Sequence, residues 1–446
     1  MEQTDFKQIY SIFNRQLSNV DLAFKRYLYN EIDWDTRLIG IRGARGVGKT
    51  TLLLQYIKEN FKDKSKVIWA SLDNLWIKNH RLEDFVEYIY NHGVTTIFLD
   101  EVHKLDDWAL YLKNFYDSYP DLKIVYTGSS MLEIDNSKVD LSRRQVLYTL
   151  GNMSFREYLN FMGALKYNAL TLEQILNDHV NIAMDITSQI KVFPLFEKYL
   201  HNGCYPFFVE AKNNYLLQLN SVIQLVIESD MPSVMDVTYS TVEKIKRLLM
   251  LIVSNVPFVP NITKLAQILE SSRDNCLKML YALDKANIIS LLTKQTKSYK
   301  HLASPEKVYL NNPNLMYALS GNIDLGNIRE TFFFNQLQHF TDVVMPNQGD
   351  FFVDAKYLFE VGGMSKTFDQ IKNIPNSFLV QDDMEVGFGN RIPMWLFGFL
   401  YYPHSVFSVL LGFSVAARKE ARVTVRAVMN SAAIMQMATT YQCMGM

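Results

Sequence analysis

The sequence feature that most constrains this chain is a glycine-rich turn between an apolar run and a helical pattern. Residues 43–50 read Gly-Ala-Arg-Gly-Val-Gly-Lys-Thr and fit the pattern G-x-x-x-x-G-K-[ST]. The run Leu38–Ile41 is typical of a buried parallel strand, and the pattern of Leu52–Phe61 is helical. A phosphate-binding loop requires such flanks, because its backbone N–H groups must open at the N-terminus of a helix. The segment therefore predicts a P-loop inside an α/β fold.

The residues of this loop have separate expected roles. Its glycines let backbone N–H groups face phosphate oxygens without a Cβ clash. Lys49 is expected to reach the β- and γ-phosphates of ATP, and the Thr50 hydroxyl is expected to ligate Mg²⁺. Arg45 is expected to face solvent. The nucleotide-binding residues predicted from the loop are Gly43, Gly46, Val47, Gly48, Lys49, Thr50 and Thr51.

A second element is the apolar run Thr96–Leu99, which ends in the acid pair Asp100 and Glu101. Uncompensated charge at the end of a buried strand is costly, so the pair calls for a partner. A magnesium ion and an attacking water supply one: Asp100 is expected to join the metal shell, and Glu101 to polarise the water. The pair therefore predicts hydrolysis of the bound nucleotide, with Lys49 and Glu101 as catalytic residues.

Further strand candidates extend this pattern into a parallel sheet. Val67–Ala70, Lys123–Tyr126 and Gln145–Leu150 alternate with helical patterns over the first 150 residues. The chain is 48% hydrophobic, which is enough for sizeable cores, and its net charge of −1 gives no general attraction to nucleic acid. Its three cysteines are odd in number and far apart, which argues against a disulfide framework and indicates a reducing compartment.

Two further sets of residues are catalytic candidates. Ser129 closes the strand after the acid pair and is a candidate to sense the γ-phosphate, although an ordinary turn explains it too. Arg143 and Arg144 follow, and either is a candidate arginine finger supplied to a neighbouring subunit. A solvated arginine pair is the alternative, so a homo-oligomer stays open.

The rest of the chain divides by pattern. Residues 1–30 are predicted to form an amphipathic helix, and three helices followed by a hairpin after residue 240 suggest a winged helix, with Ser271 or Ser272 capping its third helix. The expected regions are a P-loop ATPase core (1–150), a helical lid (151–235), a winged helix (236–310), a small α+β domain (311–401) and a tail of unknown role (402–446).

The segment Ile392–Ala417 has no charged residue, but Pro403 and His404 interrupt it. A membrane helix needs about 20 predominantly apolar residues, so a cytoplasmic protein without a membrane span is expected. The N-terminus does not have the pattern of a signal peptide.

Basic residues make the predicted winged helix a candidate DNA-binding element. They lie on its third helix and in its wing, where they would neutralise phosphates, although packing alone is an equal explanation. These residues are Arg273, Lys278, Lys285, Lys294, Lys297 and Lys300.

Several segments together resemble the prokaryotic AAA+-like ATPases that carry a C-terminal restriction-endonuclease-like domain. They are GARGVGKTTLL, LDEVHKLDDWALYLKNFYD, TGSSML, DLSRRQVLYTLGNMSFREYL and GCYPF, within a similarity that covers roughly residues 5–401. The resemblance implies an ATPase core, a helical lid, a winged helix and a nuclease-like module in a soluble cytoplasmic protein.

The nuclease-like module departs from the pattern that the resemblance implies. Such a site holds Mg²⁺ with a helical Glu and with Asp and Glu-x-Lys on two strands, which points to Glu330, Asp350 and Glu360 as a second, weaker metal site. The lysine position is Gly362, and neither Lys356 nor Lys366 has the right spacing to replace it. A structural or DNA-gripping module is therefore favoured over cleavage.

Three functions remain open on the sequence. The first is an Mg²⁺-dependent ATPase that couples hydrolysis to rearrangement of the winged-helix and nuclease-like modules. The second is an ATP-dependent DNA-binding switch without significant turnover. The third is a nuclease regulated by ATP.

Overall fold

The structure is a computed structural model, in which the chain divides at residue 403 and the described elements lie before that division. The expected tail 402–446, residues 295–303 of the expected wing and residues 131–140 before the arginine pair lie outside the described residues. The structure describes residues 3–130, 141, 143–234, 238–294, 304–320 and 324–400.

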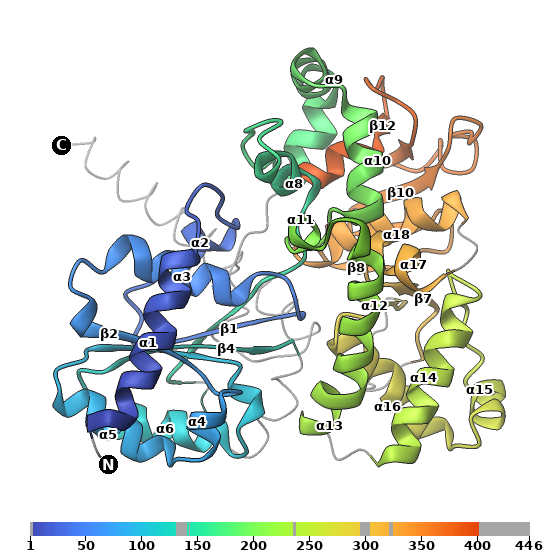
Figure 1. Cartoon of the computed structure of the whole chain (residues 1–446). Coiled ribbons are helices and arrows are strands. Elements are labelled where there is room, and N and C mark those ends of the chain that lie inside the picture. Colours follow the sequence, from blue (N-terminus) through green and yellow to red (C-terminus); the bar gives the residue numbers. More distant parts are fainter. Residues whose placement is uncertain are drawn as a thin grey trace, which may run out of the picture. The chain divides into compact units, whose positions relative to one another are not determined.

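The N-terminal part contains a five-stranded sheet in the order β2-β3-β4-β1-β5, in which every neighbouring pair is parallel (Figure 1). This confirms the predicted parallel α/β fold. Strands of such a sheet are covered on both faces, which explains their apolar sequences. The strands are β1 (Leu38–Gly43), β2 (Val67–Ser71), β3 (Thr96–Asp100), β4 (Lys123–Ser129) and β5 (Val146–Thr149).

Helices connect these strands on both sides of the sheet. The helix α3 (Lys49–Asn60) lies on one side, and α5 (Leu82–Asn91) and α6 (Trp108–Ser118) lie on the other (Figure 1). The short helix α4 (Leu75–Lys78) precedes α5. Because parallel strands run in the same direction, the carboxyl ends of β1, β3 and β4 meet at one edge of the sheet, which is where α/β folds bind ligands.

The prediction of a single helix over residues 1–30 is wrong. The chain forms α1 (Gln3–Asn19) and the short α2 (Leu28–Glu31), with a non-helical segment between them. The Gln55 amide on α3 donates to the carbonyls of Asp21 and Phe24, at 2.7 Å in each case, and so holds that segment out of a helix. The break carries Arg26 into the core, where its side chain is 4% exposed.

The region 151–235 was predicted to be mostly helical, and its described residues 151–234 are; the predicted break at residues 203–206 is present. A capping box between Ser154 and Glu157 begins the first of these helices. A π-helix, η4 (Val226–Asp230), separates the last two, and such insertions are frequent at functional sites. The helices are α8 (Phe155–Phe161), α9 (Leu172–Gln189), α10 (Val192–Asn202), α11 (Phe208–Ala211), α12 (Tyr215–Leu225) and α13 (Met231–Val234).

Three helices and an antiparallel strand pair follow in the order expected for a winged helix. Ser272, one of the two predicted caps, accepts the N–H of Asn275 through its hydroxyl. Part of the expected wing is not described, so the winged-helix assignment stays a prediction. The elements are α14 (Tyr239–Val253), α15 (Ile262–Ile268), α16 (Arg273–Lys285), β6 (Ile289–Leu292) and β7 (Lys307–Leu310).

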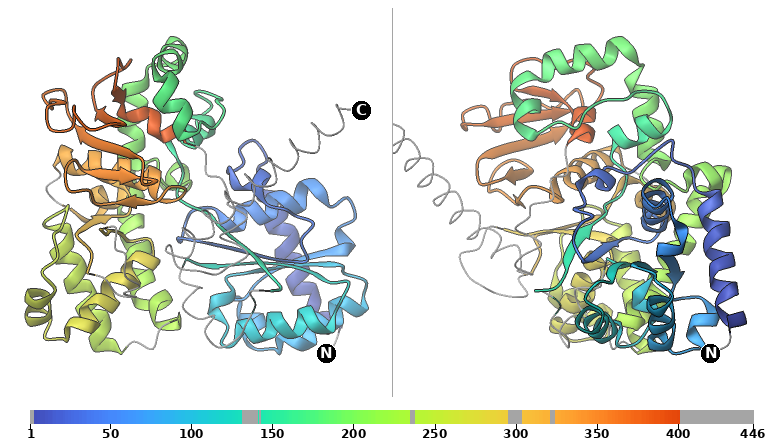
Figure 2. Two further views of the ribbon diagram at one scale, coloured as in Figure 1. Left: turned by 180° about the vertical axis from the view of Figure 1, so that it is seen from behind. Right: turned by 90° about the vertical axis from the view of Figure 1, so that its left-hand side faces the viewer.

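The last part is α+β, with a mixed sheet in the order β12-β11-β10-β9-β8 (orange to red in Figure 2). The ring of Phe333 lies 5.4, 5.1 and 4.8 Å from those of Phe351, Phe359 and Phe397, which fixes its helix on the sheet. The elements are α17 (Pro313–Leu319), α18 (Leu325–Gln338), β8 (Val343–Val344), β9 (Phe351–Val353), β10 (Tyr357–Gly362), β11 (Ser377–Gln381), β12 (Arg391–Pro393) and the 3₁₀ helix η5 (Met394–Phe399).

The described part of the uncharged segment 392–417 is not a membrane helix. Residues of η5 are buried in the protein core. Across the described ranges of the chain, no helix is both long and apolar enough to span a bilayer.

Asp284, near the end of α16, gives a pH-dependent prediction. It accepts the N–H of Leu291 on β6 at 3.1 Å, and burial raises its pKa to about 7. Because the folded-state pKa lies above the unfolded value, the folded protein binds the proton more tightly, and the free energy of unfolding falls as the pH rises from about 4 to about 7. Asp284→Asn removes this penalty and keeps an acceptor. The substitution is expected to raise the free energy of unfolding by roughly 1–2 kcal/mol at pH 8. This value is reduced because the residue is partly exposed. No such stabilisation is expected at pH 4.5.

Urea unfolding of the wild type and the variant at several pH values checks this expectation. The difference between the two proteins cancels the contributions of other titrating groups. A difference that does not change with pH would contradict the role of Asp284.

Candidate functional site

The glycine-rich turn lies between β1 and α3, as predicted. Gly46 and Gly48 have φ angles of +84° and +95°, in the left-handed region that favours glycine. The ammonium group of Lys49 donates to the carbonyls of Gly43 and Ala44 at 2.9 and 3.0 Å. Burial lowers the pKa of Lys49, and nearby carboxylates oppose that shift. The lysine is therefore held inside the turn rather than on its surface.

Asp100 accepts two hydroxyl hydrogen bonds at the carboxyl end of β3. Thr50 donates to Asp100 Oδ2 at 2.6 Å, and Thr127 of β4 donates to Asp100 Oδ1. Burial and the charge of Glu101 raise the pKa of Asp100, while the two threonines oppose the rise. Thr50 and Asp100 thus lie close enough to share one cation.

The donor set suits Mg²⁺. This ion prefers oxygen ligands, and nucleotide-binding sites usually hold it with one or two protein groups, phosphate oxygens and water. A cation beside Asp100 would also favour the ionised carboxylate that burial opposes. Within the described ranges, no group of three or more His, Cys, Asp or Glu side chains is placed to hold a metal ion. A site of only Thr50 and Asp100 is consistent with that finding.

Thr127 was missed as a site residue, since Ser129 was selected at the end of the same strand. Thr127 binds Asp100, and its oxygen also accepts the N–H of Glu101 at 3.1 Å. The available signal was a hydroxyl residue inside an otherwise apolar strand next to the acid pair. Ser129 lies nearby, and its N–H donates to Nδ1 of His103 at 3.2 Å.

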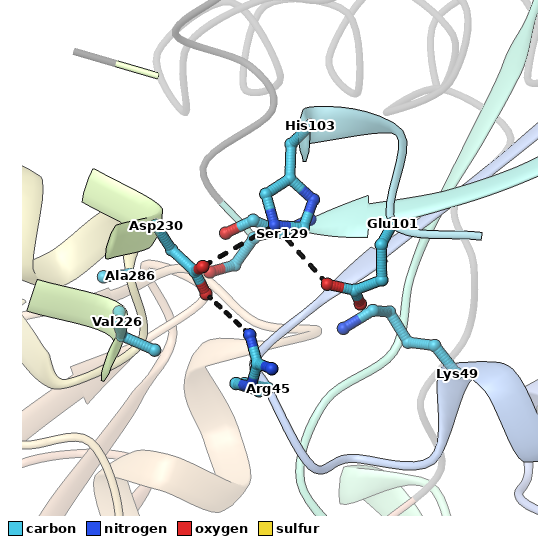
Figure 3. A pocket seen from close by; sticks show the side chains of 9 residues that line it. Arg45, Lys49, Glu101, His103, Ser129, Val226, Asp230 and Ala286 are labelled. Atoms are coloured by element: carbon cyan, nitrogen blue, oxygen red, sulfur yellow. Dashed lines mark hydrogen bonds and ion pairs between the residues drawn. The ribbon is translucent and has the colours of Figure 1, made fainter. Parts of the chain in front are cut away.

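A small pocket opens at this edge of the sheet (Figure 3). Side chains from the P-loop, from the residues after β3, from the end of β4 and from η4 line it. In Figure 3 the side chains of Lys49 and Glu101 lie next to each other within it. The lining residues are Arg45, Lys49, Glu101, His103, Ser129, Ser130, Val226, Asp230 and Ala286.

Asp230 on η4 and His103 after β3 are pocket residues that sequence reasoning missed. Asp230 makes the larger number of charged contacts. It lies 2.5 Å from Lys104 Nζ, 3.6 Å from the Arg45 guanidinium and 3.8 Å from His103 Nε2. Burial opposes its ionisation, but hydrogen bonds from His103 and Lys104 lower the pKa of Asp230 to about 2. The expectation that Arg45 faces solvent is met only in part, because its side chain is 35% exposed but also lies 3.6 Å from Asp230.

The other predicted residues of the P-loop and the two candidate finger arginines differ in burial and in their contacts. Val47 is fully buried, and Thr51 is exposed on the first turn of α3. Arg144 makes a two-pronged contact with Asp117, at 3.0 and 3.1 Å, whereas Arg143 is exposed. Neither arginine lines the pocket, and a finger role in a neighbouring subunit stays a prediction.

A buried ion pair contacts the P-loop and holds one of its carbonyl groups. Arg26 Nε lies 2.9 Å from Glu157 Oε1, and the same guanidinium donates to the carbonyls of Val47 and Gly151. Burial raises the pKa of Glu157, but the charge and hydrogen bonds of Arg26, the charge of Arg156 and the N–H of Tyr27 together lower it below its usual value. Glu157 belongs to the FREYL segment, so the pair connects that segment to the loop. No local pattern in the sequence indicated Arg26.

The GCYPF segment covers the P-loop. A Cβ atom on Gly46 would lie 2.9 Å from the Phe207 ring, so only glycine fits there. The Asn312 amide donates to the Tyr205 hydroxyl at 3.0 Å, and the Cys204 N–H donates to Asn314 at 2.8 Å. This segment therefore contacts both the loop and the N-terminal end of α17.

The acid cluster of the C-terminal sheet contains a lysine that its spacing did not indicate. Lys366 Nζ lies 2.5 Å from Glu360 Oε1, and the Lys366 side chain occupies the space beside Gly362. Glu330 accepts from the Tyr309 hydroxyl at 2.7 Å, and Asp350 accepts the N–H of Val361 at 2.9 Å. Lys356, the other candidate, donates to the Tyr357 hydroxyl instead.

These residues do not gather as a metal site, because no carboxylate trio placed for a metal ion is found among the described residues. Metal binding by Glu330, Asp350 and Glu360 stays a prediction. The geometry that is present is an ion pair.

Comparison with known families gives two matches. Residues 35–159 match the model of a family described as an AAA domain, and residues 194–325 match a domain of unknown function, DUF8612. These matched ranges end at residue 325, so they do not support the nuclease-like assignment of residues 311–401.

Two curated relatives come from Methanocaldococcus jannaschii. The uncharacterized protein MJ1637 is 28% identical over 315 residues, which are 67% of this chain and 66% of that protein. The uncharacterized protein MJ1544 is 25% identical over 171 residues, which are 36% of this chain and 38% of that protein. This chain thus spans just under two thirds of the first relative and far less of the second.

Among solved structures, the replication initiator DnaA bound to AMPPCP and single-stranded DNA is 13% identical. It covers 63% of this chain and 88% of its own chain, with a TM-score of 0.28, which is too distant a likeness to carry an argument. The parallel sheet, the loop and the family match agree with one another. Residues 35–159 therefore have the fold and the sequence pattern of an AAA-type P-loop domain.

Proposed function

We propose that this protein is an Mg²⁺-dependent ATPase whose nucleotide site lies at the carboxyl edge of the parallel sheet. The observation that carries the proposal is the 2.6 Å contact of Thr50 with Asp100, beside a lysine enclosed by the P-loop. Two elements about 50 residues apart thus supply the hydroxyl and the carboxylate that a metal–nucleotide complex requires.

Each residue has one task in this mechanism. Backbone N–H groups of the loop and the Lys49 ammonium bind the phosphates. Thr50 and Asp100 would hold Mg²⁺, which would neutralise charge that develops on the phosphates. Glu101 orients the attacking water and accepts its proton. Ser129 lines the pocket and is assigned to contact the terminal phosphate.

Two contacts connect the P-loop to the helical lid, so a change in the conformation of the loop would alter the position of the lid. Phe207 packs on Gly46, and Arg45 faces Asp230. A polar network runs on from the GCYPF segment to Asn312 and Asn314 at the start of α17. We assign to these contacts the coupling of ATP turnover to rearrangement of the helical lid and the modules that follow it.

Steady-state release of phosphate from ATP, measured with and without Mg²⁺, tests the proposal. Turnover that requires Mg²⁺ supports it. Tight ATP binding without phosphate release would instead favour the switch that acts through occupancy alone. If the rate of phosphate release per protein chain rises with protein concentration, this supports an arginine finger supplied by a neighbouring subunit, with Arg143 as its source.

DNA binding through α16 is the second part of the proposal. Arg273, Lys278 and Lys285 are exposed along this helix. Their replacement by alanine removes about three phosphate contacts, so the affinity for duplex DNA is expected to fall and the salt dependence of the affinity to weaken by a slope of about 3. Fluorescence anisotropy at several salt concentrations measures both quantities.

A matched control removes three exposed lysines elsewhere, Lys166, Lys191 and Lys198. The two triple variants have the same change in net charge. An equal loss of DNA affinity in both would mean that binding follows net charge and not α16. Plasmid DNA incubated with Mg²⁺ in the same series reports whether the C-terminal module cleaves it.

A further inference from the structure

An acidic side chain from η4 lies in the pocket, beside the cationic side chains of Arg45 and Lys49. Asp230 is 4% exposed and lines the same pocket as Lys49 and Glu101 (Figure 3). Uncompensated, a buried carboxylate beside a polyphosphate site would repel its ligand. The surroundings of Asp230 therefore decide what it does to nucleotide binding.

Three cationic or donor groups of the ATPase core surround Asp230. Lys104 makes the closest contact at 2.5 Å, and Arg45 of the P-loop and His103 lie at 3.6 and 3.8 Å. His103 Nδ1 accepts the N–H of Ser129, so Nε2 carries the proton of the neutral ring. Nε2 lies between two carboxylates, 3.5 Å from Glu101 and 3.8 Å from Asp230.

We propose that Asp230 is a specificity-determining residue that competes with the terminal phosphate of ATP for Arg45, and so opposes ATP binding while η4 is docked on the core. This inference rests on the proposed ATPase function. The pocket lies on the side of the P-loop where the acid pair is, and the terminal phosphate belongs there. The competition therefore acts on ATP more than on ADP.

The coupling is reciprocal. If docked η4 weakens ATP binding, then bound ATP weakens the docking of η4 by the same factor. Binding of the terminal phosphate therefore weakens the docking of η4, which lies between α12 and α13. Release of η4 is the step that passes the nucleotide state to the lid.

The charges around Asp230 give two variants with opposite expected effects. Asp230→Asn removes the competing charge and is expected to tighten binding of the β,γ-methylene analogue of ATP about tenfold, with less than a threefold change for ADP. Lys104→Gln leaves Asp230 without its closest cation, so repulsion grows and the analogue is expected to bind several-fold more weakly. The double variant is expected to bind the analogue about as tightly as Asp230→Asn, because Lys104 acts through Asp230, with which it is in contact.

Glu228 is the matched control. It lies on the same π-helix and has the same charge, but it pairs with Lys246 at 2.8 Å and is exposed. Glu228→Gln is expected to leave both nucleotide affinities unchanged. Thermal unfolding of each variant separates a loss of folded protein from a change in affinity.

Titration calorimetry of the full chain with the two nucleotides and Mg²⁺ measures these affinities. Equal effects of Asp230→Asn and Glu228→Gln would overturn the inference, as would weaker analogue binding in both Asp230→Asn and Lys104→Gln, which a merely structural role predicts. If the wild type binds neither nucleotide, the proposed function itself fails. Hydrogen exchange gives a second readout, because the analogue should speed amide exchange over residues 226–230 in the wild type only.

Discussion

Replacing Glu101 with glutamine is expected to lower ATP turnover by about 10²–10⁴-fold and to leave ATP binding within a few-fold of the wild type. Glutamine keeps the size and hydrogen-bonding reach of the side chain but cannot accept a proton from water. The backbone at residue 101 has a φ of +56° and donates to Thr127, and neither property depends on the carboxylate. The variant should therefore fold and bind without hydrolysing.

Lys49→Ala is the contrasting change in the same site. It removes the positive charge inside the P-loop, so ATP binding should weaken by two orders of magnitude or more, in keeping with a charged hydrogen bond worth about 1.5–3 kcal/mol and the Coulomb attraction of two phosphates. Calorimetry for affinity and phosphate release for turnover separate the two variants. If both lose binding equally, Glu101 is a binding residue and the assigned mechanism is wrong.

The proposed phosphate site could be located from the sequence because each of its parts is local. Eight consecutive residues define the loop, and a strand ending in two acids defines the partner of Thr50. The topology of a parallel sheet places these two motifs next to each other, since it brings the carboxyl ends of its strands to one edge. The meeting of Thr50 with Asp100 thus follows from a motif and a topology that local patterns indicate.

Other residues were missed because only the tertiary fold brings them to the site. Asp230 is far along the chain from Lys104, and no periodicity connects them. Likewise, Arg26 was assigned to a helix that ends earlier, at Asn19. The spacing rule also failed to place Lys366, because the loop after β10 folds back and carries this lysine to Glu360.

Arg26→Ala is expected to destabilise the protein by about 3–5 kcal/mol, the cost of leaving one partner of a buried ion pair behind. Glu157 is 2% exposed and would keep a charge without its counterion, and the carbonyls of Val47 and Gly151 would lose their donor. Urea unfolding monitored by tryptophan fluorescence measures the loss. The double variant Arg26→Met with Glu157→Gln should cost less than Arg26→Ala, because it removes both charges.

The neighbouring pair of Lys25 and Glu59 supplies the control. Its contact is shorter, at 2.5 Å, but the side chains are 25% and 41% exposed, so Lys25→Ala should cost at most about 1 kcal/mol. Because Arg26 also holds the Val47 carbonyl, any Arg26→Ala protein that stays folded should bind ATP more weakly than Lys25→Ala at the same fraction folded. Equal ATP affinity in these two folded variants would show that the ion pair supports the core alone and does not shape the phosphate loop.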